Sequence, residues 1–448
     1  MIVMKFGGSS VESAAAIERV SGIVKERLAR KPVVVVSAMG KTTNRLLDIA
    51  ARAVRGDREA ALDRLNDLRD FHLRESGMER TVDEHFRELG ELVRGLAVMG
   101  ELTPRVTDAI ASYGERLSSL IVARMFQQQG MNAVHLDARK LIVTDRRHTH
   151  AAPLPGETYR RLAECIPPLF STPSSVVVMG GFIGATEDGV TTTLGRGGSD
   201  FSASLAGAAL GAAEIQIWTD VDGMLTCDPS ILPGGHRVKT ISFAEAAELA
   251  YFGAKVLHPA TVLPAVEKNI PVLILNSRRP EVDGTRIVAE SVPCANTFKS
   301  IACKRNIAVV NVHSTRMLMA HGFLKQIFEI FDRHETSVDM VATSEVSVSL
   351  TIDNTARLEA ICGELRRFSE VTIDADQAIV CLVGDNIRYT PGVAARVFRA
   401  LGAINVPMIS QGASKLNLSF VVAANDLVPA VESLHGEFFT GLDPAVFD

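Results

Sequence analysis

The sequence lacks the features that mark several classes of protein. None of its six cysteines belongs to a C-x-x-C pair, and no uninterrupted apolar stretch reaches the roughly 18 residues of a membrane span. The N-terminus has neither the basic region nor the long apolar stretch of a signal peptide. The net charge of −5 is small, and lysine and arginine are spread along the chain, so there is no electrostatic case for nucleic acid binding. We therefore expect a cytoplasmic protein with reduced thiols that binds neither nucleic acid nor membranes.

The chain does have enough apolar residues to build large cores. Of its 448 residues, 47% are hydrophobic and 22% charged, and the length suits about three domains. Over the first 275 residues, short runs rich in Val and Ile alternate with helical patterns, which is typical of a layered α/β fold with a mainly parallel sheet. Three of the expected strands end in polar or glycine-rich loops, where ligands of such sheets bind. Strands are expected at Ile2–Met4, Val33–Val36, Ala133–Leu136, Val176–Met179, Ile215–Trp218 and Val272–Leu275.

Two regions depart from this alternation. Residues 57–129 read as two or three amphipathic helices, an insertion in a first domain spanning 1–280 that either covers a site or is purely structural. After a looser stretch, a β-α-β-β-α pattern occurs twice, with equivalent helices beginning at Gly322 and Gly392. The repeat predicts two small α+β domains, at 300–375 and 376–448. Their expected strands include Ile307–Val312, Ser337–Val341, Val346–Ile352, Ala378–Val383, Ile404–Ile409 and Leu416–Val422.

The stretch from Thr191 to Asp200 reads Thr-Thr-Thr-Leu-Gly-Arg-Gly-Gly-Ser-Asp. Its three glycines let the backbone approach a ligand closely, and Arg196 offers a bidentate fork for a carboxylate or phosphate. Ser199 and Asp200 then open a helix of small residues, so the loop ends at a positive helix N-terminus. The stretch predicts an anion site, although a tight turn with a surface arginine is equally compatible with it.

A second candidate anion site lies at the N-terminus, where Lys5 precedes Gly7-Gly8-Ser9-Ser10. Successive amides of a glycine loop form an anion nest, and the lysine adds a point charge for phosphate. The spacing is not that of a P-loop, and a surface lysine before a turn is the alternative. Asp220 and Asp222 follow another strand and either contact Mg²⁺ through water or a nucleotide, or form a turn.

Two further motifs carry charged residues among small ones. Gly114 in the middle of a helix costs about 1 kcal/mol relative to alanine, which suggests close packing or a ligand beside Glu115. The alternative is a solvent-facing Glu115–Arg116 pair that contributes little. Lys255, at the end of a helix, either reaches a phosphate or stabilises the helix end, and His258 is read as structural.

Together these motifs resemble those of aspartate kinases, in the amino acid kinase fold family. They occur in family order over nearly all of the first 275 residues. The C-terminal repeat resembles the pair of ferredoxin-like ACT domains of aspartate kinases, and Gly322-Phe-Leu, Ser337-Val-Asp and Thr343-Ser-Glu-Val-Ser are most similar to the lysine-sensitive, single-function subgroup. The matching motifs are Lys5-Phe-Gly-Gly-Ser-Ser-Val, Ser37-Ala-Met-Gly-Lys-Thr-Thr-Asn, Tyr113-Gly-Glu-Arg-Leu-Ser, Thr192-Thr-Leu-Gly-Arg-Gly-Gly-Ser-Asp, Trp218-Thr-Asp-Val-Asp-Gly and Phe252-Gly-Ala-Lys-Val-Leu-His-Pro.

The resemblance implies phosphoryl transfer from ATP, with Mg²⁺, to the side-chain carboxylate of L-aspartate, giving 4-phospho-L-aspartate for lysine, threonine and methionine biosynthesis. It implies that Arg196 binds the α-carboxylate, Glu115 binds the α-ammonium, and Asp200 orients Lys5. It assigns no direct metal ligand. Leu225 and Ser230 depart from the family, which often has an aromatic residue and an arginine there. The implied catalytic residues are Lys5, Gly8, Ser9 and Asp200; the aspartate-binding residues are Thr43, Glu115, Arg196, Gly197, Gly198 and Ser199; the nucleotide-binding residues are Lys5, Gly7, Thr219, Asp220, Leu225, Ser230, Lys255 and Val256.

The resemblance also implies feedback by an amino acid, expected to be lysine, bound between the first ACT domains of a homodimer that could further form a tetramer. Asp339 and Glu345 are the expected acidic partners, and solvated strand-end charges are the alternative. A kinase for acetylglutamate or carbamate fits the Arg196/Glu115 pair less well, and an amino acid sensor with an inactive kinase domain is the third hypothesis. The implied effector residues are Met317, Phe323, Ser337, Val338, Asp339, Thr343, Ser344 and Glu345.

Overall fold

The computed structural model describes residues 1–253, 258–314 and 321–448. The chain divides into two compact units, residues 1–223 with 256–289, and residues 224–255 with 290–448. Within the described part of the chain, no helix combines the length and apolarity that a bilayer span requires.

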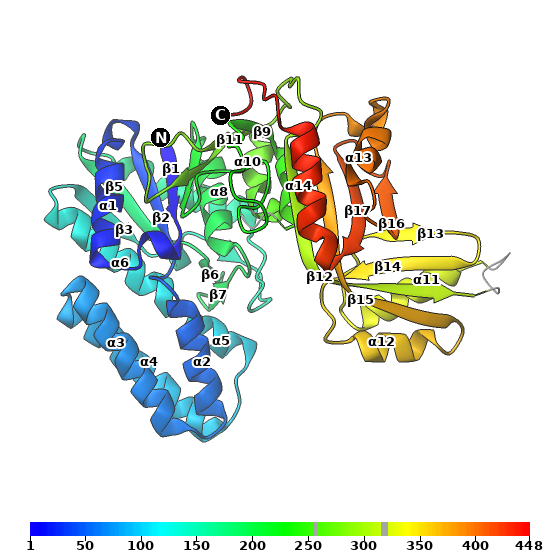
Figure 1. Cartoon of the computed structure of the whole chain (residues 1–448). Coiled ribbons are helices and arrows are strands. Elements are labelled where there is room, and N and C mark those ends of the chain that lie inside the picture. The colour runs from blue at the N-terminus through cyan, green and yellow to red at the C-terminus, as the bar shows by residue number, and fades with distance from the viewer. Residues whose placement is uncertain (254–257, 315–320) are drawn as a thin grey trace. The chain divides into compact units, whose positions relative to one another are not determined.

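The first unit is built on a parallel sheet, as predicted (Figure 1). All six strands expected in this region are confirmed, and β1 lies between β2 and β8 with parallel pairing on both sides. The strands follow the order β3-β5-β2-β1-β8-β10-β11, in which only β11 runs antiparallel to its neighbour within the unit. Their bounds are β1 Ile2–Phe6, β2 Pro32–Val36, β3 Asn132–Leu136, β5 Ser175–Gly180, β8 Ile215–Thr219, β10 Val272–Asn276 and β11 Thr285–Val288.

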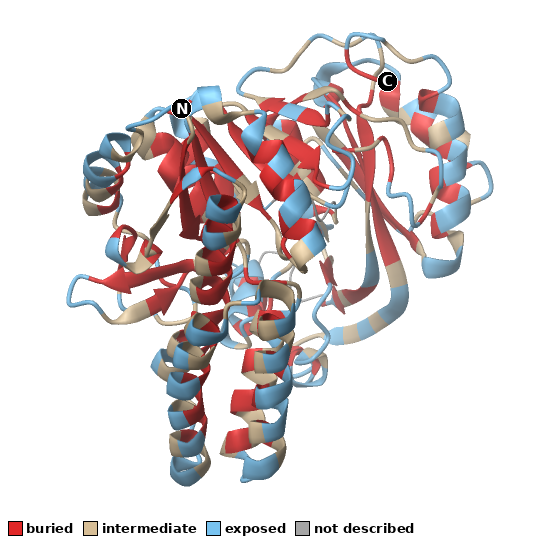
Figure 2. Cartoon of the chain, turned by 90° about the vertical axis from the view of Figure 1, so that its left-hand side faces the viewer, coloured by how far each residue is buried: buried red, intermediate tan, exposed pale blue. Residues whose placement is uncertain are grey.

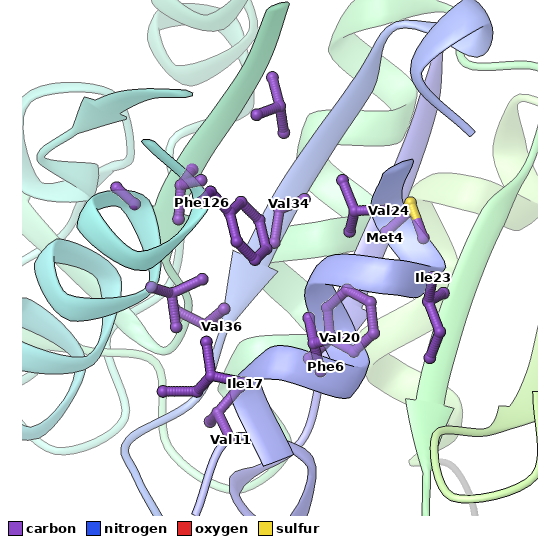
Figure 3. Packing of buried hydrophobic residues seen from close by; sticks show 14 of the residues in the cluster. Met4, Phe6, Val11, Ile17, Val20, Ile23, Val24, Val34, Val36 and Phe126 are labelled. Carbon is purple, nitrogen blue, oxygen red and sulfur yellow. The ribbon is translucent and has the colours of Figure 1, made fainter. Parts of the chain in front are cut away.

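Helices cover this sheet and bury its apolar side chains. Phe6 and Val34 of the sheet pack with Val20 of α1 and Phe126 of α6 in one core cluster (Figure 3). Because β1 and β2 are covered, nearly every residue in them is apolar and buried. The remaining elements of the layer are α1 Ala14–Lys25, α6 Tyr113–Gln128, α7 Pro155–Cys165, α8 Gly198–Leu210, α10 Leu263–Glu267 and the 3₁₀ turns η1 Gly8–Ser10, η2 Leu28–Arg30, η3 Ala138–Lys140, η4 Pro167–Leu169 and η5 Pro259–Val262.

A group of helices forms a second core within the first unit. In α2 (Thr42–Val54), α3 (Arg58–Ser76), α4 (Glu79–Met99) and α5 (Pro104–Ala111), apolar residues spaced three or four apart face one another. Figure 2 shows the buried residues of these helices along their facing sides. The expected two or three helices of residues 57–129 are four: α3, α4 and α5 pack with α2, and α6 packs on the sheet. A small sheet of β4 (Val143–Thr144), β6 (Ile183–Thr186) and β7 (Thr191–Thr193) completes the unit.

The second unit contains an antiparallel sheet in the order β13-β14-β12-β15-β17-β16. Two long strands, β12 and β15, run through both copies of the repeat. Residues 308–313 of β12 pair with β14, whereas residues 300–304 pair with the second half of β15. The bounds are β9 Thr240–Ser242, α9 Phe243–Tyr251, β12 Ser300–His313, α11 Phe323–Arg333, β13 Val341–Thr343, β14 Ser347–Ile352, α12 Leu358–Leu365, β15 Glu370–Val383, η7 Ile387–Tyr389, α13 Val393–Leu401, β16 Met408–Gln411, β17 Asn417–Ala423, η8 Ala424–Asp426 and α14 Leu427–Phe438.

The two copies begin their first helices in the same way. Gly322 precedes α11 with φ 84°, and Gly392 precedes α13 with φ 79°, a left-handed conformation that glycine adopts without strain. The expected strand at Ser337–Val341 is wrong in its bounds, because β13 begins only at Val341. Before Val341 the pairing continues irregularly: the Asp339 amide donates to the Thr351 carbonyl at 2.9 Å, and the Met340 amide donates to the Thr351 hydroxyl at 2.8 Å.

Candidate active site

The loops after β1 and β2 lie against each other at the carboxyl edge of the sheet. The Gly40 amide donates to the Gly8 carbonyl at 3.0 Å, and the Ser37 amide donates to the Phe6 carbonyl at 3.1 Å. A Cβ added to Gly8 would lie 2.8 Å from the Gly40 oxygen, so this approach requires glycine. The Gly7 amide donates to the carbonyl of Trp218 in β8, which ties the same loop to the other neighbouring strand.

Lys5 and Asp200 form an ion pair beside this loop, with 2.7 Å between Nζ and Oδ1. The side chains are only 12% and 14% exposed. Asp200 lies in the first turn of α8, where the helix dipole favours a negative charge. Gly197, at φ 71°, immediately precedes that helix, as expected for a glycine that turns the chain. Two residues predicted from separate motifs are thus in direct contact.

Glu115 is a buried carboxylate with half of its hydrogen-bonding capacity unused. The residue is 3% exposed, and its Oε1 accepts a hydrogen bond from the Ala38 amide at 3.1 Å. Oε2 has no protein partner within the described residues. Burial raises the pKa of Glu115 to about 8, against the lowering effect of the Ala38 amide. A cation brought by a ligand would restore the ionised form. The expected solvent-facing Glu115–Arg116 pair is therefore excluded.

These groups face one cavity of about 270 Å³. Seven of the predicted site residues line it: Lys5, Thr43, Glu115, Gly197, Gly198, Ser199 and Asp200. Sequence reasoning missed three others, Ser37, Phe182 and Gly195, as named site residues. The Ser37 hydroxyl donates to that of Ser199 at 3.0 Å, and its place in a recognised strand-end motif was a usable signal. Phe182 adopts φ 63°, which no local sequence feature announces.

Other predicted residues lie outside this lining. Arg196 is exposed, at the tip of the glycine loop. Thr219 ends β8, the neighbour of β1, and its hydroxyl donates to the carboxylate of the following residue, Asp220, at 3.3 Å. Asp222 accepts hydrogen bonds from Asn276 and Arg279, in keeping with a structural turn.

The remaining nucleotide-binding predictions concern the second unit or lie outside the described residues. The Leu225 carbonyl accepts a hydrogen bond from the Ser300 hydroxyl, and the Ser230 amide donates to Asp228 in a tight turn. Lys255, Val256 and the effector residue Met317 are outside the described residues. Among the described residues, no group of three or more His, Cys, Asp or Glu side chains could hold a metal ion.

In the second unit, Asp339 is in a buried ion pair rather than at a solvated strand end. The Lys304 ammonium lies 2.7 Å from Asp339 and 2.8 Å from Asp353. Burial raises the pKa of Asp339, and the attraction of Lys304 opposes that change. The Tyr251 ring faces the same ammonium, and its hydroxyl donates to the Val338 carbonyl at 3.4 Å.

The other predicted effector residues lie either in the apolar core of the first copy of the repeat or at the edge of its sheet. Phe323 packs edge-to-face on Phe368, with 5.6 Å between ring centroids, in the apolar core of the first copy. Exposed positions lie around the β13–β14 hairpin, at the edge of the sheet: Ser337, Thr343, Ser344 and Glu345.

A parallel sheet with two glycine loops, a lysine and a buried carboxylate at its carboxyl edge defines a class of phosphoryl-transfer domain. Residues 1–276 match the model of the amino acid kinase family, and residues 380–438 match that of an ACT domain. The chain belongs to the amino acid kinase family.

Comparisons with individual proteins narrow the class. The chain is 39% identical to aspartokinase 2 of Arabidopsis thaliana, over 98% of this chain and 84% of that protein. It is 37% identical to lysine-sensitive aspartokinase 3 of Escherichia coli, over 98% and 99%. The crystal structure of E. coli aspartokinase III in complex with aspartate and ADP superposes with a TM-score of 0.84, at 35% identity, over 98% of this chain and all of that one. Within its family, this chain is an aspartokinase, an ATP-dependent aspartate kinase.

Proposed function

We propose that the enzyme transfers the γ-phosphoryl group of ATP to the side-chain carboxylate of L-aspartate, giving 4-phospho-L-aspartate for lysine, threonine and methionine biosynthesis. One observation carries this proposal: the half-partnered carboxylate of Glu115 and the Lys5–Asp200 ion pair line the same cavity. A free α-ammonium group suits Glu115, whereas the acetylated nitrogen of acetylglutamate carries no charge to pair with it. The cavity thus favours an unmodified amino acid beside a phosphate-binding lysine.

The aspartate side of the site consists of Glu115 and the glycine loop. Glu115 binds the α-ammonium, and Arg196 with the loop Gly197–Ser199 binds the α-carboxylate, for which a guanidinium offers two parallel hydrogen bonds. Thr43 lines the pocket. The β-carboxylate is the nucleophile, and because a carboxyl group of ordinary pKa is ionised at pH 7, the reaction needs no general base.

The phosphate side consists of Lys5 and the loop after β1. Lys5, with the amides of Gly7, Gly8 and Ser9, holds the transferring phosphoryl group, and Asp200 keeps the ammonium in place through the 2.7 Å ion pair. Catalysis then consists of in-line positioning and neutralisation of phosphate charge.

Nucleotide binding is proposed for Thr219 and Asp220, at the carboxyl end of β8. From the family resemblance, the further proposed nucleotide contacts are Leu225, Ser230, Lys255 and Val256. Asp220 is exposed and accepts a hydrogen bond from Thr219, which leaves carboxylate lone pairs free for Mg²⁺ ligation through water. When bound with ATP, Mg²⁺ neutralises phosphate charge.

For regulation, we propose that lysine binds near the β13–β14 hairpin, at the interface of a homodimer formed through the ACT domains. A solved structure of E. coli aspartokinase III is described as a complex with lysine and aspartate, and it superposes with a TM-score of 0.84 at 34% identity. The ammonium of a bound lysine would compete with Lys304 for Asp339, with Glu345 as a second acidic partner. The cytoplasmic location remains a prediction.

The test of the reaction is trapping of the acyl phosphate by hydroxylamine. Purified enzyme with ATP, Mg²⁺ and L-aspartate should give the hydroxamate, and N-acetyl-L-aspartate should give little. The Lys5→Ala variant should lose the signal while it remains folded, although the loss of the ion pair with Asp200 should lower its melting temperature. Equal signals from wild type and Lys5→Ala would refute the proposed reaction site.

The test of regulation is an inhibition panel with lysine, threonine and methionine. Lysine should inhibit the wild type, and Asp339→Ala should abolish that inhibition. Full lysine sensitivity in Asp339→Ala would refute this effector site, and inhibition by threonine alone would refute lysine as the effector.

A further inference from the structure

Asp108, on α5, is a fully buried carboxylate that the proposed reaction does not use. It accepts hydrogen bonds from the Thr193 hydroxyl at 2.6 Å and from Nδ1 of His148 at 2.7 Å. The Thr149 amide donates to both carboxylate oxygens, at 3.0 and 3.1 Å. All these donors come from outside α5, so one side chain joins three segments of the first unit.

The residues that donate hydrogen bonds to Asp108 lie on both sides of the glycine loop of the aspartate pocket. Thr193 ends β7, two residues before Gly195. On the other side, a Cβ added to Gly195 would lie 3.2 Å from the Thr149 carbonyl oxygen and 3.0 Å from the His150 ring. The Ala151 amide donates to the Thr193 carbonyl at 2.9 Å and joins these two segments to each other. Asp108 therefore holds both segments between which Gly195 lies.

Thr149 shows that this arrangement is imposed on the backbone. Its φ is 70°, in the left-handed region that a β-branched residue rarely adopts. The two hydrogen bonds to Asp108 hold the amide in place despite this conformation. Strained residues that neighbouring groups hold in place are concentrated at functional sites.

The loop itself needs such a support. Gly195 and Gly197 have φ of 76° and 71°, and glycine loops lose the most conformational freedom when they are ordered. The helix α5 is a firm anchor because its buried residue Ile110 packs in the separate core of α2–α5. A carboxylate in that helix can hold the loop in its binding geometry before a ligand arrives.

We propose that Asp108 is a positioning residue, which fixes the glycine loop 195–198 for the α-carboxylate of aspartate. The inference rests on the proposed role of that loop in aspartate binding. It gives the helical insertion a part in the reaction, through a side chain that touches neither substrate. A buried polar cluster that only stabilises the fold would affect aspartate and ATP alike.

The chain offers a matched pair of variants. Thr193→Val removes one donor of Asp108 and leaves the other two. Thr192→Val removes the neighbouring buried hydroxyl, which pairs with Thr144 at 2.7 Å instead. Thr193→Ser restores the hydroxyl. Each variant is compared with the wild type in KM for aspartate, KM for ATP, kcat and melting temperature.

We expect Thr193→Val to lower kcat/KM for aspartate about 10- to 100-fold, since small displacements of positioning groups have effects of that size. KM for ATP should stay within about twofold, a separation that a general loss of stability would not produce. Thr193→Ser should recover most of the loss, and Thr192→Val should leave both constants near those of the wild type. Asp108→Asn should lower kcat/KM for aspartate more than Thr193→Val does. If Asp108→Asn does not fold, the comparison of Thr193→Val with Thr192→Val still tests the proposal.

Equal values of kcat/KM for aspartate in Thr193→Val and Thr192→Val would overturn the inference. So would a rise in KM for ATP in Thr193→Val that matches its loss with aspartate. Failure of the proposed function would look different. The wild type itself would then give no aspartate-dependent hydroxamate, and isothermal calorimetry with aspartate and a non-hydrolysable ATP analogue would still compare binding among the variants.

Discussion

The strongest prediction concerns the pH dependence of aspartate binding through Glu115. Burial raises the pKa of this carboxyl group to about 8, so the unliganded enzyme holds it mostly neutral at pH 7. An α-ammonium group pairs with the ionised form. Aspartate binding at pH 7 must therefore release the Glu115 proton, and affinity should rise as the pH rises through the pKa of the free enzyme.

The size of the effect follows from the fraction ionised. With a pKa of about 8, roughly one tenth of the enzyme carries ionised Glu115 at pH 7 and about nine tenths at pH 9. KM for aspartate should therefore be about tenfold higher at pH 7 than at pH 9. Glu115→Gln keeps the shape but loses the charge pair, so its kcat/KM for aspartate should fall about 100-fold and become independent of pH in this range.

The free energy of unfolding of the unliganded enzyme should fall as the pH rises, whereas the affinity for aspartate rises. The folded pKa lies above the unfolded value of 4.5, so the contribution of Glu115 is intact below pH 4.5 and is lost as the pH rises to about 8. At 1.36 kcal/mol per pH unit the full loss is about 5 kcal/mol. Glu115→Gln removes this dependence, although its amide leaves a buried group unpaired at every pH. The stability of the variant relative to the wild type should therefore increase from pH 5 to pH 8.

The assay measures hydroxamate at saturating ATP from pH 6.5 to 9, below the range in which free aspartate loses its ammonium proton. Urea unfolding of the wild type and of Glu115→Gln at pH 5 and pH 8 measures the change in the free energy of unfolding. A wild-type KM that is the same at pH 7 and pH 9 would refute the proposed pairing. A stability difference that does not change with pH would refute the raised pKa itself.

Three other perturbations test the site and its scaffold. Lys5→Ala should lower kcat at least about 1,000-fold in the hydroxamate assay, because it removes a charge that stabilises the transferring phosphoryl group. Gly8→Ala places a Cβ 2.8 Å from a carbonyl oxygen and should lower both kcat and the melting temperature, whereas Gly22→Ala, in open space on α1, should stabilise by about 0.5–1 kcal/mol in thermal unfolding. Lys299→Met removes the cation beside the buried Glu245 carboxylate, which keeps only its hydrogen bonds from Ser242 and Ser291, and should cost about 3–5 kcal/mol in urea unfolding.

Sequence patterns predicted the features that depend on neighbours along the chain. The strands of the first unit were recognisable because a strand covered on both faces is apolar throughout, as Val33–Val36 shows. Lys5, Glu115 and Asp200 could be named as candidate site residues because each lies in a motif of glycines or small residues. Sequence alone did not show that Glu115 is buried with a free oxygen, since that depends on the Ala38 amide from another loop.

Features that depend on distant partners could not be predicted. Asp108 is 41 residues from Thr149 and 85 from Thr193, and each is an ordinary residue in its own surroundings. The strand residues 300–304 gave little apolar signal, and their pairing with 379–383 follows from the long-range course of β15. Local patterns thus show which residues have suitable chemistry, whereas the hydrogen bonds between separate segments decide how that chemistry is used.

Three carboxylates near the cavity, those of Asp108, Asp200 and Glu115, differ in the partners that they have. Asp108 is satisfied by three donors, so it has no capacity for a ligand and can only hold structure. Asp200 is paired with Lys5, so it directs a cation. Glu115 keeps one oxygen unpartnered and a raised pKa, so it alone gains a partner when an ammonium group enters. Under the proposed function, selectivity for a free amino acid follows from the partner that Glu115 lacks, and substrate binding should recover the stability lost at that residue.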